Sequence, residues 1–241
     1  MDITLRQSPS FSVARLGLAG SEAVVVESGA MMAMSPEVNL TAKAEGGVLK
    51  SLKRAALGGE SLFVSTYTAP PAGGFVDIAA RLPGDITVYE VAEPTALFIS
   101  RGSWLANEKS VELDTKWGGF KNMFGSEGGF ILRAGGRGKV VFACYGALEE
   151  WNLAAGQKVT VDSGHMVAYE GSVNMSIRKA TGGSVQMFKS GEGLVLDFEG
   201  PGRVWVQTRN PMELVGWISS FLPSNSGGGS GGLIGGLLSR S

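Results

Sequence analysis

Two residue types on which enzyme and metal sites depend are almost absent from this chain of 241 residues, which contains one cysteine and one histidine. The single Cys144 excludes an internal disulfide and a zinc site built from cysteines. No run of 18 apolar residues occurs, so no transmembrane helix is predicted. Residues 1–7 have neither the basic nor the apolar region of a secretory signal. We expect a cytoplasmic protein, or one that is peripheral at the inner membrane.

Charge is also sparse, and its two signs are balanced. Only 18% of the residues are charged, and 21 basic against 22 acidic side chains leave a net charge of -1. Such a chain as a whole has no electrostatic attraction to nucleic acid or to anionic lipid. One basic cluster stands out, at Lys50, Lys53 and Arg54. Because RNA binding requires a basic face with stacking aromatic residues, a nucleic-acid partner is not expected.

The chain is rich in glycine, with 37 residues that mostly lie between short apolar runs. Four anchors recur in the same order three times: a Gly in an apolar run, a Gly pair, a Glu that opens a strand-like run, and a Gly before a second such run. The anchors are Gly29, Gly102 and Gly164; the pairs at 46–47, 118–119 and 182–183; Glu60, Glu127 and Glu192; and Gly74, Gly138 and Gly202. A repeat of this length predicts supersecondary units that stack on one another.

Few side chains suggest catalysis or a cofactor. His165 is the only imidazole that could activate a nucleophile, but in the repeat it takes an ordinary strand position. Cys144 lies in an apolar run, which favours a buried thiol. The glycines at 135–139 lack the spacing of a phosphate loop and predict a hairpin turn. The recurring glutamates could form a symmetric acidic site, although a strand-edge role is favoured. We expect no enzymatic activity, no metal and no cofactor.

The repeat divides residues 1–209 into modules at about 12–85, 86–148 and 149–209, and predicts an all-β body. One amphipathic helix is predicted over 210–223. Asn210 can cap it, Pro211 suits its first turn and Pro223 ends it. Its apolar stripe consists of Leu214, Trp217, Ile218 and Phe221. Residues 224–241 form a flexible Gly/Ser tether that ends in an apolar hook.

The repeated glycine pattern, the stretch GPGRVWVQTR at 200–209 and the Gly-rich tail with its apolar end resemble the altered inheritance of mitochondria (number twenty-four) family. The resemblance covers nearly the whole chain, and the stretch at 200–209 is its most specific part. It implies a β-sandwich like that of the tryptophan RNA-binding attenuation protein (TRAP-like), with pseudo-threefold symmetry among the three modules and trimers in solution. Eukaryotic members are associated with the mitochondrial inner membrane and its organisation.

The candidate interaction residues are long apolar side chains in two places. Threefold symmetry would gather on one face those that follow the Gly pairs, although they could instead cap each module's core; they are Leu52, Met123, Phe124, Met187 and Phe188. The hook contributes Leu233, Ile234, Leu237 and Leu238. Six apolar residues are too few to span a bilayer, so we expect the hook to dock onto its own oligomer or a partner.

Two functions of different classes remain open at this point. The first is a non-enzymatic oligomeric scaffold or interaction protein, a trimer by preference, that holds a protein or a peripheral membrane partner and is linked to membrane or envelope organisation. The second is a β protein that binds a small ligand or RNA. The balanced charge favours the scaffold.

Overall fold

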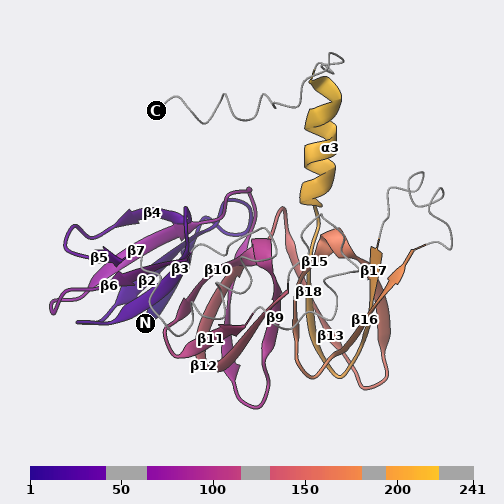
Figure 1. Ribbon diagram of the computed structural model, residues 1–241, viewed down its shortest axis with the longest axis horizontal. Coiled ribbons are helices and arrows are strands. Elements are labelled where there is room, and N and C mark those ends of the chain that lie inside the picture. The colour runs from indigo at the N-terminus through magenta and orange to yellow at the C-terminus, as the bar shows by residue number, and fades with distance from the viewer. Residues whose placement is uncertain (42–63, 115–130, 181–193, 223–241) are drawn as a thin grey trace, which may run out of the picture. The chain divides into compact units, whose positions relative to one another are not determined.

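The computed structural model describes residues 1–41, 64–114, 131–180 and 194–222 (Figure 1). They belong to two units, Met1–Asn210 and Pro211–Ser241. The described part of the first unit consists of strands with two short 3-10 turns, and that of the second contains helix α3 (Pro211–Phe221). The predicted all-β class with one C-terminal helix is therefore confirmed.

Each predicted module contributes its own set of strands. The first contains β2 (Val13–Leu18), β3 (Ala23–Glu27), β4 (Met31–Met34), β5 (Asn39–Thr41), β6 (Val64–Thr68) and β7 (Gly74–Ala79), preceded by β1 (Asp2–Arg6). The second contains β8 (Ile86–Ala92), β9 (Leu97–Ser100), η2 (Arg101–Ser103), β10 (Trp104–Glu108), β11 (Val111–Asp114) and β12 (Ile131–Ala143). The third contains β13 (Leu148–Leu153), β14 (Lys158–Asp162), η4 (Ser163–His165), β15 (Met166–Glu170), β16 (Asn174–Lys179), β17 (Leu194–Glu199) and β18 (Gly202–Gln207).

One antiparallel pairing scheme occurs in all three modules. In the third, β13 and β15 pair with β18, while β14 and β16 pair with β17. In the first, β2 and β4 pair with β7, while β3 and β5 pair with β6. In the second, β8 and β10 pair with the C-terminal half of β12, while β9 and β11 pair with its N-terminal half. We therefore call the first four strands of each module its first to fourth strands. The second strands are β3, β9 and β14, and the third strands are β4, β10 and β15.

A β-bulge recurs in every third strand. The register against the last strand shifts between Met31 and Ala33, between Trp104 and Ala106, and between Met166 and Ala168. A bulge inserts one extra residue and bends its strand. The glycine that formed the first sequence anchor lies in the turn before each bulge. That anchor therefore marks a recurring change of chain direction.

The last Gly anchor supports a recurring hydrogen bond. A side-chain oxygen that follows each bulge accepts from the backbone N–H of the residue after the glycine: Ser35 from Phe75 at 3.0 Å, Glu108 from Lys139 at 3.0 Å, and Glu170 from Arg203 at 2.9 Å. Gly138 and Gly202 have φ angles of +147° and +138° there, which a residue with a Cβ rarely adopts. A Cβ on Gly202 would also lie 2.7 Å from Cγ2 of Val173.

The hairpin turn predicted at 135–139 is wrong, because these residues lie inside the continuous strand β12. Gly136 and Gly138, with φ angles of +87° and +147°, bend the chain without reversing it. Each half of β12 can then belong to a different sheet. In the other two modules, two separate strands correspond to the two halves of β12: β6 and β7 in the first module, and β17 and β18 in the third.

Neighbouring modules are joined by strand pairing. The third strand of each later module pairs with the second strand of the one before it: β10 with β3, and β15 with β9. Two large sheets result, β5-β6-β3-β10-β12-β8 and β11-β12-β9-β15-β18-β13. Two smaller sheets are separate from them: the N-terminal sheet, β1-β2-β7-β4, and the C-terminal sheet, β14-β17-β16.

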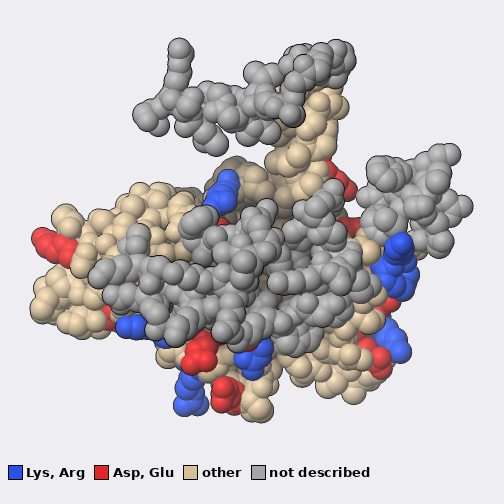
Figure 2. All heavy atoms as spheres, in the orientation of Figure 1, with Lys and Arg blue, Asp and Glu red and all other residues tan. Residues whose placement is uncertain are grey.

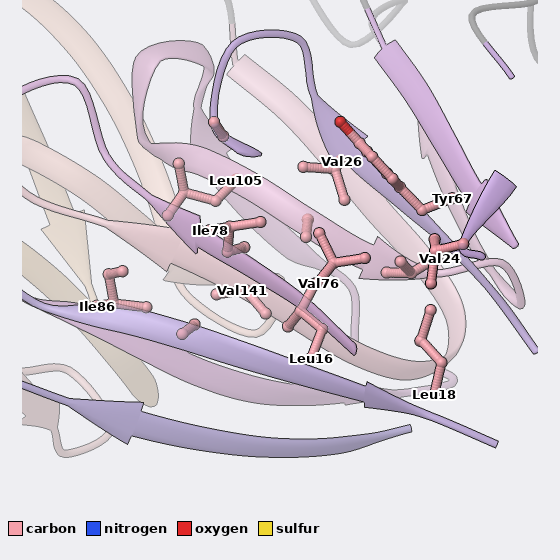
Figure 3. Packing of buried hydrophobic residues seen from close by; sticks show 14 of the residues in the cluster. Leu16, Leu18, Val24, Val26, Tyr67, Val76, Ile78, Ile86, Leu105 and Val141 are labelled. Atoms are coloured by element: carbon pink, nitrogen blue, oxygen red, sulfur yellow. The ribbon is translucent and has the colours of Figure 1, made fainter. Parts of the chain in front are cut away.

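Three apolar cores fill the spaces between these sheets. In the first core, Leu16 of β2 and Ile78 of β7 pack with Val26 of β3 and with Leu105 and Val141 of the second module (Figure 3). Every core but the last thus contains side chains of the following module. Closure into a ring of three would also pair β4 with β14, and among the described residues these strands do not pair. The pseudo-threefold axis stays a prediction.

Candidate functional site

The interaction residues predicted from the sequence lie outside the described residues. Those after the Gly pairs fall in 42–63, 115–130 and 181–193; they are Leu52, Met123, Phe124, Met187 and Phe188. The hook residues fall in 223–241; they are Leu233, Ile234, Leu237 and Leu238. The recurring glutamates are likewise outside, at Glu60, Glu127 and Glu192. These assignments remain predictions, and the candidate site is built from other side chains.

His165 is held by the end of strand β18. Its Nδ1 donates to the backbone carbonyl of Gln207 at 2.7 Å, since a carbonyl can only accept. The buried Gln207 side chain accepts from the N–H of Tyr145 at 2.8 Å and donates to the carbonyl of Gly164 at 2.9 Å. The imidazole therefore serves a backbone contact that fixes the turn before β15.

Cys144 is buried at the end of the second module. Its thiol donates to the carbonyl of Gly146 at 3.3 Å. Burial raises the pKa of the Cys144 thiol, which keeps it protonated at neutral pH. A protonated, enclosed thiol is a poor nucleophile.

The stretch at 200–209, the most specific part of the sequence pattern, has structural roles. Thr208 exchanges hydrogen bonds with Ala147: its N–H donates to the Ala147 carbonyl at 3.0 Å, and its Oγ1 accepts the Ala147 N–H at 2.9 Å. The N–H of Arg209 donates to the carbonyl of Tyr145 at 3.3 Å. With Gln207, these bonds fasten the end of β18 to the segment between β12 and β13.

A charged cluster lies at the junction of the second and third modules. Glu170 accepts from the hydroxyl of Tyr89 at 3.0 Å and from Nε of Arg203 at 2.8 Å. Trp205 Nε1 donates to Glu150 at 2.8 Å, and the Arg203 guanidinium lies 5.0 Å from the Tyr89 ring centroid and 5.1 Å from that of Trp205. Burial, with the Glu170 contact, raises the pKa of Tyr89. These groups satisfy one another, as in an ion-pair network that joins strands.

Helix α3 presents a large apolar surface. It has no buried residue, and the exposed fractions of Trp217 and Phe221 are 63% and 69%. The two rings contact edge to face, with centroids 5.1 Å apart. The exposed apolar side chains of α3 and its end are Met212, Val215, Trp217, Ile218, Phe221 and Leu222. Exposed apolar surface concentrated in this way is typical of an interaction site.

Strand β4 presents a second apolar surface, which the sequence did not predict. Met31 and Met32 are 36% and 55% exposed. Their counterparts at the same bulge are buried: Trp104 and Leu105 in β10, and Met166 and Val167 in β15. The sequence signal that could have found it is the place of β4 in the first of the three modules, where neither of the other two supplies a strand beside it.

The rest of the described surface adds few features of functional interest. No group of three or more metal-ligating side chains occurs in the described ranges. No described helix is long and apolar enough to cross a membrane. On the face seen in Figure 2, basic and acidic side chains are interspersed.

The chain is similar to a known protein family, to a protein of known sequence and to a solved structure. The family described as mitochondrial biogenesis AIM24 matches residues 3–209. The uncharacterized protein M6_Spy0233 of Streptococcus pyogenes serotype M6 is 26% identical over 234 residues, which cover 94% of this chain and 93% of that protein. The crystal structure of protein SPYM3_0169 from Streptococcus pyogenes has a TM-score of 0.78 at 24% identity, covering 92% of this chain and 99% of that one.

Proposed function

The chain belongs to the mitochondrial biogenesis AIM24 family, and on that premise we propose that it is a non-enzymatic oligomeric scaffold that binds a protein partner through helix α3. The observation that carries this proposal is the exposure of α3, where no residue is buried and six apolar side chains in and just after the helix face solvent. Full burial of each such side chain against a partner would contribute about 1.5–3 kcal/mol to the free energy of binding.

The spacing of the apolar residues supports a protein groove as the partner surface. Leu214, Trp217, Ile218 and Phe221 follow the i, i+3, i+4, i+7 pattern of helices that dock in grooves. Helices that lie on anionic membranes carry basic residues on their polar face, whereas α3 contains Glu213 and no Lys or Arg. A role in membrane or envelope organisation would then depend on the partner protein.

Among the described residues, the side chains considered for catalysis have structural partners. The His165 imidazole and the Cys144 thiol both bond to backbone carbonyls, and Glu170 is bound by Arg203 and Tyr89. These contacts support a protein without catalytic chemistry. The net charge of -1 likewise gives no support to the alternative of an RNA-binding β protein.

The test compares two variants with aromatic-to-serine changes by affinity capture, followed by binding of the purified partner. Trp217→Ser with Phe221→Ser alters α3, and Phe11→Ser is the matched control because Phe11 is 71% exposed outside α3. We expect one partner to be lost with the α3 variant and retained with Phe11→Ser. If both variants bind it equally, the proposal is wrong. Flotation with vesicles that depends on Trp217 and Phe221, with no protein partner, would replace the groove by a lipid surface.

A further inference from the structure

At both junctions between modules, the third strand of one module pairs with the second strand of the module before it. Strand β4 of the N-terminal sheet and strand β14 of the C-terminal sheet have no such pairing among the described residues. Within the described residues, β4 pairs only with β7, and β14 pairs only with β17. The other third strands have two partners each: β10 pairs with β12 and β3, and β15 with β18 and β9. Strand β4 is therefore a third strand without a second strand beside it, and β14 is a second strand without a third strand.

The burial of equivalent side chains shows what is missing at β4. Leu105 of β10 is 1% exposed and packs in the core of the first module, where Figure 3 shows it beside Ile78. Val167 of β15 is fully buried in the core of the second module. Met32 holds the same place in the bulge of β4 but is 55% exposed. At the equivalent positions of β10 and β15, the side chain packs in the core of the preceding module, so Met32 is placed to pack in the core of another module.

The core of the third module shows the complementary deficit. Val24 of β3 and Leu97 of β9 are fully buried, whereas the equivalent Val159 of β14 is half-buried. Met175 and Ile177 of the neighbouring β16 are also only partly buried against this core. The first two cores contain side chains of the module that follows, and the third contains none.

We propose that β4 of one copy pairs antiparallel with β14 of a second copy, so that the N-terminal sheet of one joins the C-terminal sheet of the other. The internal junctions fix the register. Ala106 lies opposite Val26, and Ala168 opposite Ile99. The equivalent pairs between copies are Ala33 with Val161 and Met34 with Thr160, which places Met32 over the exposed part of the third core.

The occupant is a second copy because the same interface already occurs twice within the chain. Each large sheet takes three strands from each of two modules, and the joined sheet would do the same, with β1 added at its edge. The interface is head-to-tail, so its repetition gives a closed ring or an open filament. It deepens the proposed scaffold function and rests on it, because it supplies the self-association that such a scaffold requires.

The first test is sedimentation of the full chain and two matched variants over a range of concentrations. Met32→Lys places a charge where the interface would be dry, and we expect at least about a tenfold weaker association with unchanged circular dichroism. Leu40→Lys is the control: Leu40 is 42% exposed on β5, and neither β5 nor the equivalent strands β11 and β16 pair across a module junction within the described ranges. A monomeric wild-type chain, or an oligomer that survives Met32→Lys, overturns the proposal.

The second test is a disulfide cross-link at the predicted register, in a Cys144→Ser background. Chains with Met34→Cys mixed with chains with Thr160→Cys should give a dimer of one of each, while neither variant alone does, because directly opposite Cβ atoms lie about 5 Å apart. Leu40→Cys mixed with Thr160→Cys should give none. In a chain carrying both cysteines, a bond confined to a single chain would show intramolecular closure and overturn the pairing of copies.

A third measurement separates this interface from the role of α3. Trp217→Ser with Phe221→Ser should lose the partner protein and keep the oligomer, while Met32→Lys should do the reverse. If the α3 variant dissociates the oligomer and Met32→Lys leaves it intact, self-association runs through α3 and the β4–β14 pairing is wrong, although the scaffold role stands.

Discussion

Tyr169 and Phe98 lie opposite each other across the β15–β9 junction, and their rings stack with centroids 5.0 Å apart and an interplanar angle of 14°. The Tyr169 hydroxyl is buried and has no hydrogen-bond partner in the described structure. Burial raises the pKa of this hydroxyl well above its usual value. The ring therefore stabilises the junction between two modules, while the hydroxyl opposes it.

We predict that Tyr169→Phe stabilises the protein by about 1 kcal/mol, because it keeps the stacked ring and removes an unsatisfied polar group. Urea unfolding should show a higher midpoint with an unchanged m-value. Tyr89→Phe is the matched control: its hydroxyl donates to Glu170, so its loss should lower stability by about 1 kcal/mol. A lower midpoint for Tyr169→Phe would contradict the prediction.

Asp77 should make the first module sensitive to acid. Its side chain is buried and accepts from Arg15 Nε and Nη2, and from Arg6 Nη2, each at 2.8 Å. The hydrogen bond from Arg15 lowers the pKa of Asp77 most, burial opposes it, and Arg6 lowers it further. A carboxyl whose folded pKa is depressed contributes stability above its unfolded pKa of about 4, and this is lost as the pH falls toward the folded pKa.

Asp77→Asn should therefore cost about 1–3 kcal/mol at pH 7, and the difference from wild type should narrow as the pH falls below about 4. Chemical unfolding at a series of pH values measures both. Asp197→Asn is the control, since Asp197 binds Arg178 at 2.6 Å on the exposed surface, where such pairs contribute little. A difference from wild type that stays constant with pH would refute the assignment.

Gly202 should tolerate no side chain. Its φ angle of +138° and the closeness of Val173 predict that Gly202→Ala costs about 1–3 kcal/mol. Gly102→Ala is the matched control, because nothing lies within 4 Å of a Cβ there and the expected change is below about 0.5 kcal/mol. Thermal unfolding of both variants measures these losses of stability. If the two variants lose the same stability, the hydrogen bond of Arg203 to Glu170 does not depend on the glycine.

Gln207 should contribute to the junction at the end of β18. Gln207→Ala removes the partners of the Tyr145 N–H and the Gly164 carbonyl and is expected to cost about 1–3 kcal/mol. Gln157→Ala also removes an acceptor from a backbone N–H, that of Ala154, but at an exposed site where water replaces it. A cost below about 0.5 kcal/mol is expected for this control. Equal destabilisation by the two variants, measured in urea, would argue against the role of Gln207.

The sequence predicted the class of the fold because its anchors are local features. Gly29, Gly102 and Gly164 mark turns, and Pro211 and the stripe through Phe221 mark the helix. These signals depend on backbone conformation and periodicity, which are encoded nearby in the chain. The exposed apolar face of the helix follows from the same pattern.

Other features depend on distant partners, and the local sequence patterns do not predict them. The glycines at 135–139 read as a turn, since nothing local shows that the two halves of β12 pair with different sheets. Met32 and Leu105 hold the same position in the repeat, but Leu105 packs in the core of the first module, whereas no described module covers Met32. The candidate surface on β4 is thus a property of the module order.

The continuity of β12 has a further consequence for how the chain comes apart. Its 13 residues pair with four other strands and belong to both large sheets, each of which also contains strands of a neighbouring module. Opening β12 would break both sheets together, so we expect the middle module to show no unfolding transition of its own. The outer modules would open first at their outer strands in a single chain, whereas opening of the central module would break the pairing of all three. Three repeats joined in this way form one cooperative unit.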